Sequence, residues 1–249
     1  MLTALALDVL GLSGESAPSP SPTGAGAASG TASSGPFEVT AWMENEAGCT
    51  ALPQRLSSPK DRAELVSGGD VEAVVRRHSG ARVGDLVVGF TLEGGARSLT
   101  ITSIDIEPAS PRADPSFSGT LLCEPGAGGE PKIQMFADLD RPNPVLVTGM
   151  ASARPYFREK VITLQPGEQV NLSATFRAEN GSRAFKLLIR YVQNGKEATL
   201  PVPSPRGSRY AVTGFATRYG AVYEGSPGGV YRRVEGARPC RWSPTSQGC

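Results

Sequence analysis

The chain has 249 residues, enough for one sizeable domain or two small ones. Its 25 basic and 24 acidic side chains give a net charge of +1, so no strong field attracts nucleic acid, and such a partner is not expected. The 30 glycines and 21 prolines favour turns over long helices. A single histidine, His78, excludes a metal site built from several histidines, and we expect no cofactor.

The first 36 residues predict an attachment segment. Residues 1–12 are mostly apolar but are interrupted by Asp8, and as a helix they would rise about 18 Å, less than a bilayer core of about 30 Å. They resemble the end of a transmembrane helix whose beginning is missing, which suggests an N-terminal membrane anchor; the alternative is a short amphipathic helix. Residues 13–36 are Ser, Gly, Ala, Pro or Thr except for Glu15. We predict a disordered linker there, because these residues bury too little apolar area to fold.

Residues 37–224 are predicted to form a β domain, followed by a Gly/Pro/Arg-rich tail at 225–249. One or two short helices are expected near residues 59–78, because Ser58 and Asp70 suit N-caps and Pro59 suits a first helical position. Elsewhere, apolar and polar residues alternate along short segments, which is typical of strands. The expected strands are residues 37–42, 85–92, 99–106, 120–123, 132–138, 145–148, 161–164, 170–176, 184–192, 197–202, 210–216 and 219–223.

This spacing of strands predicts a mainly β fold: an antiparallel β-sandwich, either immunoglobulin-like or a partly open barrel. Asn194-Gly195 indicates a tight hairpin, Pro166-Gly167 a type II turn, and the broken alternation near Thr102-Ser103 a β-bulge. The residues expected to face the core are Val87, Phe90, Leu99, Ile101, Leu172, Phe176, Leu188 and Tyr191.

Four cysteines indicate the compartment. Cys49, Cys123, Cys240 and Cys249 show no C-x-x-C spacing, so a zinc site is not expected. An even number of cysteines in a Gly/Pro-rich β chain is typical of disulfides formed outside the cytoplasm. We expect Cys240 to pair with Cys249 around a short loop, which leaves Cys49 for Cys123. Other pairings, or four free thiols in a cytosolic protein, are the alternatives.

Two groups of residues are candidate binding sites. Asp138 and Asp140 lie two apart, so on a strand they would share a face and could help to bind a hard cation such as Ca²⁺; the alternative is a pair of solvated acids at a strand end. In the tail, Arg232, Arg233 and Trp242 could contact an anionic cell-envelope polymer or lipid headgroups. The alternative there is a flexible, solvated tail.

The order of these segments resembles that of uncharacterised actinobacterial membrane-anchored proteins with an extracytoplasmic β domain. The resemblance is carried by W-M-E-N-E-A-G-C (42–49), L-V-V-G-F-T-L-E-G (86–94), L-T-I-T-S-I-D-I-E-P (99–108), Cys123 and F-A-D-L-D-R-P-N-P (136–144), and it covers residues 1–224. It implies a location and a fold, and it implies no activity.

Two functions remain. The first is a non-enzymatic interaction or sensing domain outside the cytoplasm, tethered to the cell envelope, whose partner is a cell-envelope polymer or a protein. The second is a carbohydrate-active or other hydrolase that uses acidic residues on a β scaffold. No G-x-S-x-G motif is present, and His78 is interpreted as a helix C-terminal charge rather than a catalytic base. We therefore favour the first.

Overall fold

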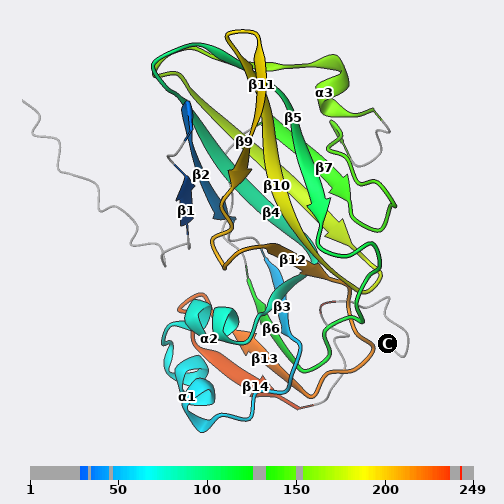
Figure 1. Cartoon of the computed structure of the whole chain (residues 1–249). Helices are drawn as coiled ribbons and strands as arrows, with labels where there is room; N and C mark the ends of the chain where they lie inside the picture. The colour runs from blue at the N-terminus through cyan, green and yellow to red at the C-terminus, as the bar shows by residue number, and fades with distance from the viewer. Residues whose placement is uncertain are drawn as a thin grey trace, which may run out of the picture.

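The structure is a computed structural model that describes residues 29–32, 35–44, 47–125, 133–149, 154–235 and 242. This part of the chain is mainly β, as predicted, and its strands form one large, open, mixed sheet (Figure 1). The helices are α1 (Pro59–Ser67), α2 (Val71–Arg77) and α3 (Tyr156–Glu159). The strands are β1 (Ser29–Ala32), β2 (Phe37–Met43), β3 (Gly48–Leu52), β4 (Ala81–Gly94), β5 (Leu99–Pro108), β6 (Thr120–Glu124), β7 (Ile133–Asp138), β8 (Ile162–Leu164), β9 (Gln169–Ala178), β10 (Ser182–Gln193), β11 (Lys196–Val202), β12 (Tyr210–Thr213), β13 (Ala221–Gly225) and β14 (Tyr231–Val234).

Two layers of the sheet form a sandwich. The layer we call the β4 layer has the order β1-β2-β4-β9-β7. In the opposite β10 layer, β10 pairs with β5 along one edge and with β11 and β12 along the other, and β8 extends the layer beyond β5. Most pairs are antiparallel, as expected, but β7 with β9, β12 with β4 and β13 with β6 are parallel.

One hydrophobic cluster fills the space between these layers. At its centre the Phe176 ring from β9 lies 4.8 Å from that of Phe185 on β10, and the Phe185 ring stacks on Tyr210 at 5.6 Å. Each ring is at least 98% buried. Burial of such large apolar side chains from both layers is the main force that holds the layers together.

The predicted inner face is right at six positions and wrong at two. Val87 on β4 and Leu188 on β10 lie outside the core cluster, which instead contains their neighbours Leu86 and Leu187. Successive residues of a strand point to opposite faces, so an error of one position moves a side chain to the other face. Both strands are apolar at adjacent positions, and the pattern alone therefore did not identify the inward face.

A third part of the sheet, the β6 layer (β14-β13-β6-β3), continues from the first residues of β4 and carries α1 and α2 on one face (Figure 1). Leu65 of α1 and Val74 of α2 are fully buried in a cluster with Leu122 of β6 and Tyr223 of β13. The sandwich core and this helix-covered core are therefore separate clusters joined by one continuous sheet.

The predicted helix signals are confirmed. The Ser58 hydroxyl accepts a hydrogen bond from the Asp61 backbone N–H at 3.3 Å, and the Asp70 carboxylate accepts one from Ala73 N–H at 2.8 Å. Pro59 is the first residue of α1, and Gly68 ends it with φ +71°, a left-handed conformation that glycine adopts without strain.

The predicted turns and bulge are confirmed too. Asn194 and Gly195 have φ values of 52° and 72°, the two positive angles of a tight hairpin turn between β10 and β11. Gly167 has φ +71°, and its turn carries the chain from β8 in one layer to β9 in the other. In the pairing of β5 with β10, Ser103 lies opposite Arg190 and Ile101 lies opposite Tyr191, so Thr102 is the extra, bulged residue.

Three predicted boundaries need correction. Residues 29–32, predicted as part of the disordered linker, form β1, because the free edge of β2 supplies backbone partners even to small side chains. Residues 231–234, predicted as tail, form β14 on the edge of β13, with Tyr231 buried. Residues 145–148 form no strand, and Val147 makes only isolated bridges.

The rest of the predicted linker before residue 29, and the apolar residues 1–12, lie outside the described residues. No helix in the described ranges has the length and apolar character needed to cross a bilayer.

Two adjacent leucines test the observed register. Leu187→Ala should lower the free energy of unfolding by about 2–5 kcal/mol, because Leu187 is fully buried. Leu188→Ala, the matched control, should cost about 1 kcal/mol or less, because its side chain lies half-buried outside the core cluster. Urea denaturation of both variants measures the difference. Equal costs, or the reverse order, would show that β10 presents the other face.

Candidate functional site

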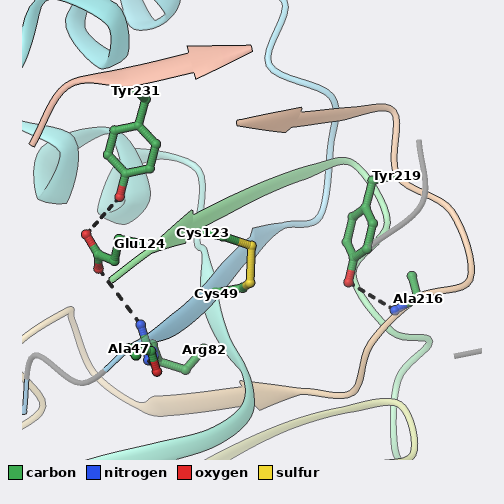
Figure 2. The surroundings of a disulfide bond; sticks show 8 residues. All are labelled: Ala47, Cys49, Arg82, Cys123, Glu124, Ala216, Tyr219 and Tyr231. Carbon is green, nitrogen blue, oxygen red and sulfur yellow. Dashed lines mark hydrogen bonds and ion pairs between the residues drawn. A yellow bond between two sulfur atoms is a disulfide. The ribbon is translucent and has the colours of Figure 1, made fainter. Parts of the chain in front are cut away.

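The disulfide joins two neighbouring strands below the sandwich. Cys49 on β3 lies directly opposite Cys123 on β6, with an S–S distance of 2.03 Å and a Cα–Cα distance of 4.0 Å (Figure 2). Both residues are at least 99% buried. The predicted pairing of these two cysteines is confirmed, whereas Cys240 and Cys249 lie outside the described residues.

Polar groups next to the disulfide anchor β14. The Tyr231 hydroxyl donates a hydrogen bond to the Glu124 carboxylate at 2.9 Å, and a guanidinium nitrogen of Arg82 lies 3.9 Å from the other carboxylate oxygen (Figure 2). Burial, reinforced by the negative charge of Glu124, raises the pKa of Tyr231. The Tyr231 phenol therefore stays protonated and acts as a structural donor.

The predicted binding residues of the tail have separate roles. Exposed Arg232 forms an ion pair at 3.5 Å with the largely buried Glu224 across the β13–β14 hairpin, and Arg233 is exposed on the same strand. Trp242 packs against the cluster that surrounds the disulfide. Arg232 and Arg233 therefore lie on a strand, and Trp242 contributes to packing.

Asp138 and Asp140 accept hydrogen bonds from neighbouring parts of the chain. Asp138 accepts hydrogen bonds from the Asp140 backbone N–H at 3.0 Å and from Arg141 Nε at 3.2 Å. One oxygen of Asp140 accepts three hydrogen bonds at 2.9–3.0 Å, from the backbone N–H groups of Glu179 and Asn180 and from the Asn180 side chain. In the described part of the chain, no three Asp, Glu, His or Cys residues form a group that could hold a metal ion.

His78 belongs to a hydrogen-bonded group around buried Asp61 that links the two helices. Its Nε2 lies 2.8 Å from Asp61 Oδ2, and Arg77 bonds the other carboxylate oxygen. Asp61 is 4% exposed. The hydrogen bond from His78, helped by the charge of Arg77, lowers the pKa of Asp61 despite its burial. The predicted C-terminal position of His78 on α2 is confirmed, and its ring ties α2 to α1.

A hollow of about 350 Å³ lies where β5, the loop after β7 and the start of β10 meet, and we call it the Arg183 hollow. This volume falls within the range of small-ligand sites. Its wall contains four arginines and two aspartates, so it has two positive charges in excess although the whole chain carries only one. The charged residues are Arg112, Arg141, Arg183, Arg209, Asp114 and Asp140; apolar parts of the wall include Ile106, Leu139, Phe185 and four prolines.

Arg183 is the most enclosed of these arginines, with 21% of its side chain exposed. Its Nε lies 3.8 Å from Asp140 Oδ1, too far for a hydrogen bond, and both atoms are buried with no hydrogen-bond partner. The guanidinium groups of Arg112 and Arg209 form no hydrogen bond or ion pair with any residue that the structure describes. The hollow therefore offers cationic donors whose capacity the protein itself leaves unused, which suits an anion.

A second hollow, of about 390 Å³, is lined by Arg76, Arg206 and Arg209, and we call it the Arg206 hollow. Arg206, 13% exposed, donates two hydrogen bonds to Glu72, one of them at 2.8 Å. Its remaining nitrogen, Nη1, is buried without a hydrogen-bond partner. Arg209 lines both hollows.

The sequence analysis missed these arginines because they are far apart along the chain. Arg112, Arg183 and Arg209 come from three different segments, and only the sheet brings them to one wall. The segment P-R-G-S-R at 205–209 carried a weak signal, since it places two arginines in one turn-forming loop. Asp140, a candidate cation ligand in the sequence, lies 3.8 Å from Arg183 Nε.

Comparisons with known proteins add no assignment. No family model matches the chain, and no curated protein matches it in sequence. The function has to be inferred from the chemistry of the described residues.

The disulfide should contribute about 4 kcal/mol to stability, because it closes a long loop between residues 74 apart and so restricts the unfolded chain. Thermal or urea unfolding of the wild type with and without reductant should show this loss. The double variant Cys49→Ala/Cys123→Ala is the control, since reductant should no longer change its midpoint. An unchanged wild-type midpoint after verified reduction of the Cys49–Cys123 bond would contradict the prediction.

The contacts of Asp61 with His78 and Arg77 should make the stability of the fold depend on pH in the acid range. Because the folded state lowers the pKa of Asp61, its contribution is complete above the unfolded pKa of about 4 and is lost as pH falls below that value. Asp61→Asn should cost about 2 kcal/mol at pH 7 and should make the loss of stability in acid shallower. Asp105→Asn removes an exposed carboxylate paired with Arg190 and should cost less than about 1 kcal/mol. Urea midpoints across the acid range measure both variants, and parallel acid profiles for wild type and Asp61→Asn would rule out this role.

Proposed function

We propose that this chain is a non-enzymatic interaction or sensing domain, located outside the cytoplasm, that binds an anionic ligand in the Arg183 hollow. The observation that carries the proposal is the excess of positive charge in that hollow, with Arg183 Nε buried and lacking a hydrogen-bond partner. A guanidinium forms paired, charge-assisted hydrogen bonds with a carboxylate or phosphate, and an ion pair behind it fixes its orientation. In this arrangement Asp140 is the positioning residue and Arg183 the binding residue.

The location is supported by the Cys49–Cys123 disulfide. A buried structural disulfide is typical of proteins that fold in an oxidising compartment. The membrane tether and the likeness to actinobacterial membrane-anchored proteins stay predictions from the sequence.

The binding function is favoured over catalysis by acidic residues because the acidic side chains described above are already engaged. Asp138 and Asp140 accept hydrogen bonds from the backbone and from Arg141 or Asn180. A general acid at neutral pH needs a raised pKa, whereas the pKa of buried Asp61 is lowered.

Titration with citrate, a compact tricarboxylate, tests the hollow. Citrate should shift the backbone amide resonances of residues 106–114 and 182–185 in NMR spectra, and the affinity should fall as salt rises. Arg183→Gln should weaken binding about tenfold, since it removes a charge-assisted contact. Arg190→Gln removes the same charge from the same strand but lies on an exposed ion pair outside the hollow, so it should leave citrate binding unchanged.

Arg112→Gln provides a second variant that keeps the fold, because its side chain is exposed and forms no ion pair within the described residues. It should weaken citrate binding as well. Equal effects of Arg183→Gln and Arg190→Gln, or no citrate binding by folded wild type, would remove the proposal.

The location has its own test. Peptide mapping without reductant, on protein taken from the cell envelope, should recover Cys49 linked to Cys123. Recovery of the protein from the cytoplasm with both thiols free would contradict an extracytoplasmic location.

A further inference from the structure

We infer that the two hollows form one extended site for an acidic polypeptide segment, with Arg209 between them. This inference rests on the proposed function and names its ligand class. A small anion would occupy one hollow, whereas a segment with several carboxylates would contact both.

Arg209 is the connecting residue. It comes directly before β12, its side chain is exposed, and it contributes to the wall of each hollow. No described residue neutralises its guanidinium. Arg112 on one side and Arg76 on the other extend the positive charge in both directions, and Arg76 has only a long ion pair of 3.9 Å with exposed Asp70.

The two hollows have the same arrangement of charged side chains. Each contains an enclosed arginine paired with a carboxylate of the protein: Arg183 with Asp140 and Arg206 with Glu72. Each of these arginines also has one buried nitrogen with no hydrogen-bond partner. Buried donors without a partner are rare in folded proteins. At both hollows, therefore, the protein leaves part of an arginine's hydrogen-bonding capacity unused, which favours an acidic ligand.

The walls favour a polypeptide over a phosphate polymer. The Arg183 hollow combines its charges with the exposed rings of Pro108, Pro111 and Pro142, which form a rigid apolar surface. Aliphatic side chains next to carboxylates can pack on such a surface, and this burial adds to the binding free energy. A phosphodiester chain offers little apolar area for the same contact.

The dependence of affinity on ligand length tests whether the two hollows form one site. Glutamate oligomers of two, four and eight residues should bind the full chain with rising affinity, by about tenfold or more from the shortest to the longest, because further carboxylates reach the second hollow. Arg76→Gln, which changes only the Arg206 hollow, should weaken binding of the eight-residue oligomer severalfold and leave citrate binding unchanged. Arg209→Gln should weaken the binding of both ligands.

Two further probes test the ligand class. An eight-residue peptide of alternating Glu and Leu should bind more tightly than one of alternating Glu and Ser, which has the same charge. Polyphosphate of matched charge should bind more weakly than the Glu-Leu peptide. Tighter binding of polyphosphate, or equal binding of the two peptides, would overturn the assignment to an acidic polypeptide.

The outcomes separate this inference from the function on which it rests. If citrate binds and depends on Arg183, but affinity does not rise with oligomer length and Arg76→Gln has no effect, the extended site is wrong and the proposed function stands. If neither citrate nor any oligomer binds, both are wrong.

Discussion

Strand β4 connects every part of this molecule. Its residues 84–93 pair with β9 and its residues 88–94 pair with β2, which builds one layer of the sandwich. Its first residues, 81–83, pair instead with β3 and β12, and so join the helix-covered layer and the β10 layer. The backbone hydrogen bonds of one strand thus fix the positions of three layers, and the arginine hollows depend on that arrangement because their walls come from several of them.

Local chemistry made parts of this fold predictable from the sequence. Ser58, Pro59 and Asp70 determine where the helices begin, and Asn194-Gly195 determines a hairpin, because each acts through its own or neighbouring backbone. The Cys49–Cys123 pair followed from the compartment and from elimination. None of these inferences required knowledge of distant contacts.

Features that depend on distant contacts were not predictable in the same way. In β4 the run L-V-V-G-F is apolar on both faces, so only the opposing layer decides that Leu86 faces the core and Val87 does not. The predicted pair Asp138 and Asp140 was identified as a pair of acids, but its role depends on Arg183, more than forty positions away, and on the turn at Asn180. The arginines of the two hollows are placed by sheet topology, and single-sequence patterns carry little information about that topology.

Strand β1 covers the outer edge of β2 at the start of the folded region. β2 has β4 on one side, and its other side would be an open row of backbone donors and acceptors if β1 did not pair with it. Such open edges invite pairing with strands of other molecules, which leads to aggregation. The four small residues of β1, Ser29–Ala32, offer a new partner a short outer edge with no bulky apolar side chains. A fragment cut at Phe37, where the hydrophobic strand pattern begins, would therefore lose its edge protection and self-associate, whereas one that begins before Ser29 would keep it.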